Sequence, residues 1–197
     1  GTDGFVAIWY DQSGNAANAT NTTATRQPKI VSSGSTILEN GKAAVDFDGS
    51  NDYLVSAFSS SISTITTSIV FNAPSGGFFF DDNNVVNINS LYTISTNTIR
   101  LINDNKSIIH SIAPDVWGDQ HLTSFVSDAT NSKIGIDGSF TTGNVGTNPM
   151  SGITLGGAAG GLIPLNGTMQ EAIIYGSNKS SDLSGIETNI NSHYSIY

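Results

Sequence analysis

The chain contains no cysteine, and only seven of its 197 residues are lysine or arginine. The absence of cysteine excludes disulfides and thiolate metal sites. A nucleic-acid partner requires a basic surface that displaces counterions, and the net charge of −9 argues against such a surface and against attraction to an anionic membrane. No apolar run approaches the ~20 residues that a membrane-spanning helix needs. We therefore expect neither nucleic-acid binding nor membrane insertion.

Charged residues of both signs are scarce, at 12% of the chain, so solubility rests on serine, threonine, asparagine and glycine. This composition favours short strands joined by many turns over long helices. A chain of 197 residues is long enough for one β-sandwich with a sizeable core. We expect a single domain over 1–197. The N-terminus lacks the basic region of a signal peptide and begins abruptly, as in a domain cut from a longer precursor.

The stretch 41–54 organises the predicted fold. Val45 and Phe47 alternate with two aspartates, which is the period of a half-buried strand. Turn-forming residues follow at 48–52, and an apolar strand resumes by Leu54. The pattern predicts a strand, a tight polar turn and a second strand, arranged as a central hairpin.

Similar short apolar runs continue along the chain at close, regular spacing, which is typical of an antiparallel sandwich or barrel. The predicted strands cover 5–10, 28–31, 62–71, 78–80, 85–88, 91–94, 99–102, 108–112, 122–126, 133–136, 153–155 and 168–175. Asp137 and Gly138 form a strong hairpin signal. The residues Asp81-Asp82-Asn83-Asn84 are typical of a solvated acidic turn, although a calcium ion there would offset some of the negative charge.

Helical spacing occurs at the C-terminal end. Leu183, Ile186, Ile190 and Tyr194 recur at intervals of three and four residues. A short C-terminal helix is therefore predicted, with residue 181 or 182 as its N-cap.

Several motifs occur in an order that resembles a known family. They are Asp11-Gln12-Ser13-Gly14-Asn15, Phe47-Asp48-Gly49-Ser50-Asn51-Asp52-Tyr53-Leu54, Ile136-Asp137-Gly138, Thr154-Leu155-Gly156-Gly157 and Leu165-Asn166-Gly167-Thr168-Met169-Gln170-Glu171. Together they resemble the laminin-G-like, concanavalin-A-like jelly-roll family over nearly the whole chain. Trp9-Tyr10 before the first motif and Ile186-Glu187-Thr188-Asn189-Ile190-Asn191 resemble one branch of it. That branch includes arabinofuranosidase catalytic domains, phage structural proteins and bacterial surface proteins.

The resemblance implies an all-β fold, a two-sheet antiparallel jelly-roll sandwich of the concanavalin A-like type, with a concave face that often binds glycans. One jelly roll hosts many functions, so function has to be argued from residues.

Hydrolysis of a glycosidic bond requires two carboxyl groups on either side of the scissile bond. Glutamates are few, at Glu39, Glu171 and Glu187, and none lies in the Glu-x-Asp-x-x-Glu pattern of jelly-roll glucanases. Glu171 can serve as one carboxyl group with Asp46 or Asp119 as its partner, or it can simply face solvent. The sequence therefore favours a protein without catalytic activity.

Sugar recognition combines aromatic rings, which stack on pyranose C–H groups, with polar side chains that bond the hydroxyls. Trp117, Tyr92, Tyr53 and Phe78 lie near predicted loops or strand ends and are candidates. The alternative for each is a place in the core, which we assign to Trp9.

Calcium prefers carboxylate and carbonyl oxygens, which Asp11, Asn15 and Asn18 supply within one short segment. The alternative is an Asx-turn in which the Asp11 carboxylate accepts hydrogen bonds from backbone amides. Calcium is thus a candidate cofactor at these residues.

The leading hypothesis is a glycan-binding or surface-recognition module of a phage virion or bacterial surface protein. Its partner is a polysaccharide or cell-surface glycan, and its location is extracellular or on a virion. Two alternatives remain open. One is a structural decoration or fibre domain that contacts virion or surface proteins, and the other is a glycoside hydrolase that resembles arabinofuranosidase.

Overall fold

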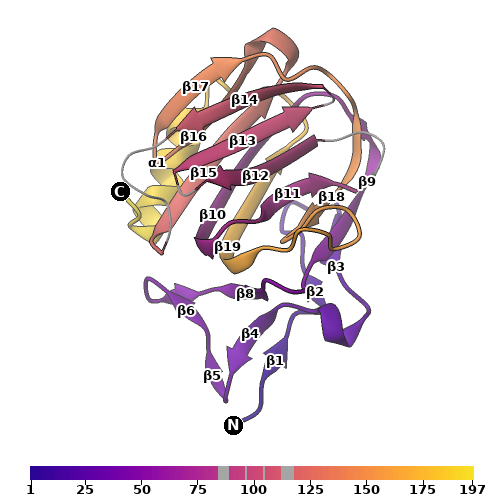
Figure 1. The fold of residues 1–197 in the computed structure, drawn as a ribbon, viewed down its shortest axis with the longest axis vertical. Coiled ribbons are helices and arrows are strands. Elements are labelled where there is room, and N and C mark those ends of the chain that lie inside the picture. The colour runs from indigo at the N-terminus through magenta and orange to yellow at the C-terminus, as the bar shows by residue number, and fades with distance from the viewer. Residues whose placement is uncertain (84–88, 96, 104, 112–117) are drawn as a thin grey trace.

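The computed structural model describes residues 1–83, 89–95, 97–103, 105–111 and 118–197. Two antiparallel sheets lie face to face (Figure 1). The first sheet has the order β1-β4-β8-β19-β10-β15-β16-β17, and β5 pairs with β4. Its strands are β1 (Gly4–Phe5), β4 (Lys29–Ser32), β5 (Ser35–Thr36), β8 (Val45–Asp48), β10 (Ile65–Ser75), β15 (Gln120–Ser127), β16 (Ser132–Ile136), β17 (Ser139–Gly143) and β19 (Asn166–Tyr175).

The second sheet has the order β14-β13-β12-β11-β18-β9-β3-β2. Its strands are β2 (Ile8–Trp9), β3 (Ala19–Thr20), β9 (Leu54–Ile62), β11 (Phe78–Asp82), β12 (Asn89–Ser95), β13 (Thr98–Asn103), β14 (Lys106–Ser111) and β18 (Met150–Leu155). A separate small hairpin joins β6 (Leu38–Glu39) to β7 (Lys42–Ala43). The other elements are the 3₁₀ turns η1 (Ala24–Arg26) and η2 (Ala129–Asn131) and the helix α1 (Leu183–Tyr194).

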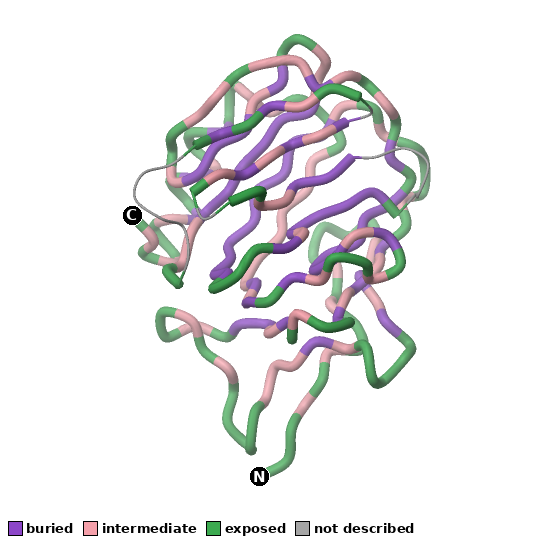
Figure 2. The backbone as a smooth tube through the Cα atoms, viewed as in Figure 1, coloured by how far each residue is buried: buried purple, intermediate pink, exposed green. Residues whose placement is uncertain are grey.

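The core lies between the two sheets and is built from inward-facing apolar side chains of both. Phe71 of the first sheet meets Phe79 of the second with ring centroids 4.3 Å apart, and Phe80 meets Phe125 at 5.4 Å. All four rings are fully buried. Figure 2 shows that buried residues run along the central strands of both sheets. The predicted all-β sandwich is therefore confirmed.

The expected hairpin over 41–54 is wrong in one respect. The two strands form, but β8 pairs with β19 in the first sheet, whereas β9 pairs with β18 in the second. The Asp48 carboxylate accepts hydrogen bonds from the backbone amides of Ser50 and Asn51, which tightens the turn between the two strands. The connection therefore crosses from one layer to the other, and the residues on either side of it, Phe47 and Leu54, are both fully buried in the core.

Two predicted strands are also divided. The run 5–10 splits into β1 and β2, which belong to different sheets. The run 62–71 splits at residues 63–64 into the end of β9 and the start of β10, which also lie in different sheets. The predicted strand 85–88 lies outside the described residues. In Figure 1 the N-terminal strands β1, β4, β5 and β6 extend from one end of the sandwich.

The hairpin predicted at Asp137-Gly138 is confirmed. These residues connect β16 to β17, and both have positive φ, +49° and +79°. Two consecutive positive φ angles are those of a type I′ turn, whose twist matches that of the flanking strands.

The predicted C-terminal helix is confirmed as α1, which covers the outer face of the first sheet. Ile190 packs there against Val70 and Leu122. Asp182 occupies the N-cap position, although its side chain makes no capping hydrogen bond. Across the described ranges, no helix has the length and apolar character needed to cross a membrane. On the first sheet α1 thus covers the outer face near β10 and β15.

Candidate functional site

Phe78 and Tyr92 face away from the core because of a β-bulge in β11. Phe78 lies opposite Tyr92 and Phe80 lies opposite Leu91, so two steps along β11 match one step along β12. Strict alternation would place Phe78 and Phe80 on the same face of the sheet. The bulge instead lets Phe79 and Phe80 both enter the core and leaves Phe78 half-buried beside Tyr92 on the outer face.

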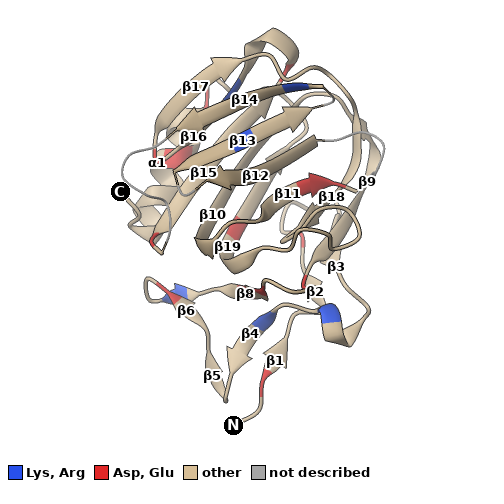
Figure 3. Ribbon diagram, in the orientation of Figure 1, with Lys and Arg blue, Asp and Glu red and all other residues tan. Residues whose placement is uncertain are grey.

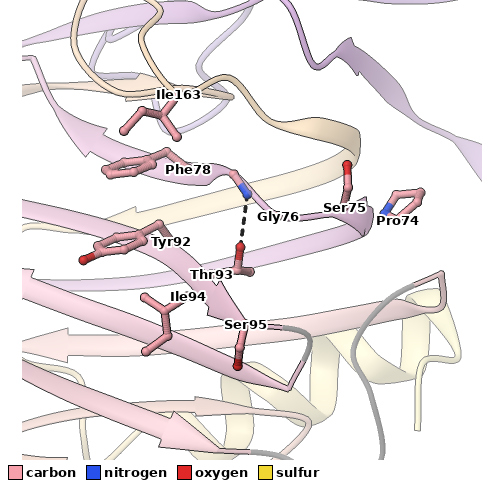
Figure 4. A pocket seen from close by; sticks show the side chains of 10 residues that line it. Pro74, Ser75, Gly76, Phe78, Tyr92, Thr93, Ile94, Ser95 and Ile163 are labelled. Atoms are coloured by element: carbon pink, nitrogen blue, oxygen red, sulfur yellow. Dashed lines mark hydrogen bonds between the residues drawn. The ribbon is translucent and has the colours of Figure 1, made fainter.

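The two rings stack at the wall of an open groove of about 720 Å³. Their centroids are 4.5 Å apart and their planes differ by 4°. Figure 4 shows both rings in a row between Ile163 and Ile94. The groove is lined by Pro74, Ser75, Gly76, Gly77, Phe78, Tyr92, Thr93, Ile94, Ser95 and Ile163. The surface is thus an apolar ridge beside serine and threonine hydroxyls.

Thr93 fixes one end of the groove. Its Oγ1 accepts a hydrogen bond from the Gly77 backbone amide at 3.1 Å, drawn as a dashed line in Figure 4, and its own amide donates to the Gly77 carbonyl at 3.2 Å. These two bonds tie β12 to the chain just before β11. They hold the two aromatic strands in the register that stacks the rings.

The loop between β18 and β19 forms the other wall. The Ala159 amide donates to the Asp81 Oδ2 at 2.7 Å, and this bond fastens the loop onto the outer face of the second sheet. Ile163 on this loop is 61% exposed and has a φ of +46°. A β-branched residue in the left-handed region is strained, and such strain is typical of ligand-binding positions. The loop therefore presents an apolar side chain to the groove in a conformation that it does not adopt easily.

The four predicted carbohydrate-binding residues have different places. The structure brings Phe78 and Tyr92 together in the groove. Tyr53 lies apart from it, where its ring covers the Cα of Gly161 and its hydroxyl accepts a hydrogen bond from Arg26 at 3.4 Å. Trp117 lies outside the described residues. Trp9, assigned to the core, is half-buried and packs against the core cluster.

The other residues that line the groove were not predicted as site residues, among them the two isoleucines beside the aromatic pair. Ile94 alternates with Tyr92 along β12, so strand periodicity was the signal that placed both on one face. Ile163 is brought to the groove by the fold of the β18–β19 loop, and its sequence context, Leu-Ile-Pro, carries no signal of ligand binding.

Asp81 and Asp82 are buried rather than solvated, so the predicted acidic turn is wrong at these two positions. They are the last residues of β11. Asp81 accepts a hydrogen bond from Ser90 and lies beneath the β18–β19 loop, whereas Asp82 faces inward and is fully buried. Burial raises the pKa of both carboxyl groups, that of Asp82 to about 6.

The Asp11 segment forms the Asx-turn that the sequence left open. The Asp11 carboxylate accepts hydrogen bonds from the amides of Ser13 and Ala17 at 2.8 and 3.0 Å, and from the Ser13 hydroxyl at 2.9 Å. These bonds, led by the Ser13 amide, lower the pKa of this exposed carboxyl group. Asn18 Oδ1 accepts from the Asp11 amide, and Asn15 Nδ2 donates to the Ser13 hydroxyl. Calcium at Asp11, Asn15 and Asn18 stays a prediction.

Glu171 lines a second, smaller hollow of about 460 Å³ beside α1, together with His193 and Tyr194. Burial raises the pKa of this carboxyl group, and the nearby His193 opposes the shift. Asp46 and Asp119 were the two candidate partners of Glu171. Asp46 lies on β8, opposite Thr168 of β19, and Asp119 is exposed; neither lines the hollow. Among the described residues, Glu171 is the only carboxylate that lines it. In the described part of the chain, no group of three or more histidine, aspartate or glutamate side chains lies close enough together to hold a metal ion.

Comparison with family models gives no match, and comparison with curated protein sequences gives none. Solved structures do match. A mutant GH54 α-L-arabinofuranosidase soaked with 4-nitrophenyl α-L-arabinofuranoside is 15% identical with a TM-score of 0.72 over 94% of this chain. The receptor-binding domain of botulinum neurotoxin type G is 12% identical with a TM-score of 0.58 over 98% of this chain. Domains LG4-5 of the mouse laminin α1 chain are 14% identical with a TM-score of 0.50 over 64% of this chain.

These similarities define the class of fold. The chain has the laminin-G-like, concanavalin A-like jelly-roll sandwich that its motifs predict. It spans about half the length of the arabinofuranosidase and of the neurotoxin domain, and 39% of the laminin fragment. At these identities the likeness concerns the fold, so the function has to be argued from the groove.

Proposed function

We propose that this domain binds a glycan in the groove of the second sheet, without catalysis. The observation that carries the proposal is the stacked pair of Phe78 and Tyr92, held at a groove by a bulge that turns Phe78 out of the core. A phenylalanine ring is normally more favourable inside the core, so its position on the outer face is consistent with a binding surface.

The groove has the two chemical features that sugar recognition needs. Its ridge of Phe78, Tyr92 and Ile94 offers apolar surface to pyranose C–H groups. The hydroxyls of Ser75, Thr93 and Ser95 lie along the same groove and offer hydrogen-bond partners to sugar hydroxyls. Its volume, about 720 Å³, falls within the range of small-molecule sites.

We further propose that the domain acts in an extracellular or virion setting, as a recognition module of a phage or bacterial surface protein. The support comes from the motifs that resemble the jelly-roll branch with phage structural and bacterial surface proteins, and from a composition rich in uncharged polar residues. The partner is then a polysaccharide or cell-surface glycan, and virion or surface proteins are further candidate partners.

Replacement of Tyr92 by alanine is expected to weaken glycan binding about tenfold or more, because it removes one ring and leaves the other without its stacking partner. A glycan array identifies a ligand, and calorimetric titration then measures its affinity. Phe78→Ala is expected to have a similar effect. Tyr10→Ala is the matched control, because Tyr10 is 61% exposed and does not line the groove.

Binding that survives alanine at both Phe78 and Tyr92 would count against the groove. A protein that binds no glycan on the array would favour the structural role through protein contacts. Release of reducing sugar from arabinan or laminarin, abolished by Glu171→Gln, would instead support hydrolysis.

The array also tests calcium. If calcium bound at Asp11, Asn15 and Asn18 supports glycan recognition, chelation is expected to weaken binding and Asp11→Ala to reproduce that loss. Because the Asp11 carboxylate already holds its turn through three hydrogen bonds, the variant is compared with wild type by thermal unfolding in chelator. Equal affinity with calcium and with chelator would rule out this role.

A further inference from the structure

The outer face of the second sheet continues from the groove onto β13 and β14. Tyr92 lies opposite Arg100, and Arg100 lies opposite Ile109, in the register of these strands. The neighbouring positions Leu101 and Ile108 are buried in the core. Arg100 therefore shares the outer face with the aromatic pair and is the next side chain along the same row.

The Arg100 guanidinium is held in place by neutral partners. Its Nη1 donates to the Tyr92 hydroxyl at 3.1 Å, and its Nη2 donates to the Ser107 hydroxyl at 3.0 Å. Its Nε–H is buried, and no atom of the residues that the structure describes accepts a hydrogen bond from it. A guanidinium carries five N–H donors, so these contacts satisfy only part of the group. The two hydroxyls orient the guanidinium without neutralising its charge.

Within the part of the chain that the structure describes, the ion pairs are Lys29–Asp3, Lys179–Asp182 and His121–Asp137, and none involves Arg100. Strands β12, β13 and β14 contain Arg100 and Lys106 and no acidic residue. Figure 3 shows basic residues in blue on both β13 and β14. Within these ranges Arg100 thus lies beside the groove without an acidic partner, in a chain whose net charge is −9.

We propose that the glycan carries a carboxylate, as uronic and sialic acids do, and that Arg100 binds it while the sugar ring lies against Phe78 and Tyr92. This inference rests on the proposed function and specifies its ligand class. A planar guanidinium matches a carboxylate through two parallel hydrogen bonds, and a half-buried arginine is screened less by solvent than an exposed one. A neutral sugar makes no such charged contact.

The test uses matched pairs of oligosaccharides that differ in charge. Trigalacturonate is compared with its methyl ester and a sialylated oligosaccharide with its unsialylated form, while a sulfated sugar distinguishes a carboxylate from any anion. The wild-type protein is expected to bind the carboxylated member at least tenfold more tightly, with a preference that falls as salt rises. Arg100→Gln is expected to remove that preference.

Two further variants separate charge from positioning. Tyr92→Phe keeps the ring but removes one of the two hydroxyls that hold Arg100, so it is expected to weaken the binding of acidic sugars more than that of neutral sugars. Equal losses for the two kinds of sugar would contradict the role of Arg100. Lys106→Gln is the matched control for positive charge, since Lys106 is exposed at the start of β14. Thermal unfolding confirms that each variant is folded.

Wild-type protein that prefers neutral sugars would overturn this inference and leave the proposed function standing, provided that Tyr92→Ala weakens their binding. A preference for acidic sugars that persists in Arg100→Gln would also overturn it. Stronger binding of the sulfated sugar would replace a carboxylate with a sulfate as the recognised group. Absence of binding to every sugar would overturn both proposals together.

Discussion

Replacement of Asp82 by asparagine is expected to stabilise the protein at pH 7 by about 3 kcal/mol. Asp82 is fully buried, and burial raises its pKa from 3.8 to about 6. Among the residues that the structure describes, none forms an ion pair with it. At neutral pH its carboxylate is therefore ionised at a free-energy penalty, which asparagine avoids.

The buried neighbour of Asp82 adds to this effect. Asn89 donates its side-chain amide to Asp82 Oδ2 at 3.3 Å, but among the residues that the structure describes neither Asn89 Oδ1 nor Asp82 Oδ1 has a hydrogen-bond donor. Two acceptor oxygens without a donor are unfavourable inside a protein. An asparagine at position 82 keeps one side-chain oxygen that accepts from the Asn89 amide, and it adds an amide group that can donate to Asn89 Oδ1.

The sign of the pH dependence follows from the raised pKa. An unfolded chain releases this proton near pH 3.8 and the folded protein near pH 6, so the folded state binds more protons between these values. Stability is thus expected to fall as pH rises through this window and to level off above it. The gain from Asp82→Asn is expected to be present at pH 7 and absent at pH 3.5.

Urea unfolding at several pH values measures this difference. Asp52, whose pKa burial also raises to about 6, titrates in both proteins, so the difference between them isolates Asp82. Asp119→Asn removes the same charge at an exposed position and is expected to change stability by less than about 0.5 kcal/mol. The contrary result is that Asp82→Asn destabilises the protein at pH 7 with calcium but not with chelator. That result would show that a bound cation compensates the charge of the Asp82 carboxylate.

Replacement of Gly156 by alanine is expected to destabilise the fold by about 3 kcal/mol or more. Gly156 begins the loop that carries Ile163 to the groove, and its φ is +81°. A left-handed alanine costs about 1–2 kcal/mol by itself. In addition, a Cβ there would lie 2.1 Å from the ring of Phe47, which is fully buried and cannot move aside without disturbing the core.

Gly160 provides the control within the same loop. Its φ is +78°, but a Cβ there would meet no heavy atom within 4 Å. Gly160→Ala therefore has the cost of a left-handed backbone without the steric clash, and it is expected to lower the free energy of unfolding by about 1 kcal/mol. Urea unfolding of both variants separates the two contributions. Equal losses in the two variants would mean that Phe47 and the loop rearrange together without strain.

Local patterns were sufficient for much of the fold. Alternation along 45–48 marked strand β8, the apolar run in 168–175 marked β19, and the Asp137-Gly138 pair marked its hairpin, because each signal depends on neighbours in the sequence. The spacing of Leu183 and Ile190 marked α1 for the same reason. Each of these elements can be predicted from the short segment of sequence that forms it.

The candidate site was predicted only in part. Phe78 and Tyr92 were each candidates for sugar binding, but nothing in the sequence indicated that they would stack, since a bulge in β11 decides which face Phe78 occupies. Arg100 carried no signal, because its importance depends on which residues lie beside it on β12 and β14. Asp82 follows three phenylalanines and was expected in a solvated turn, but β11 extends through it into the core.

The sequence by itself determined that this protein is an all-β chain, with its strands, its tight turns and its terminal helix, because short-range periodicity and turn-forming residues are sufficient for these. Only the tertiary structure decided that β8 and β9 enter different sheets, that the β18–β19 loop lies over Asp81, and that two aromatic rings and an arginine form one row. The physical reason is that sheet membership and facing side chains depend on contacts between residues far apart in the chain, whose energies no local pattern contains.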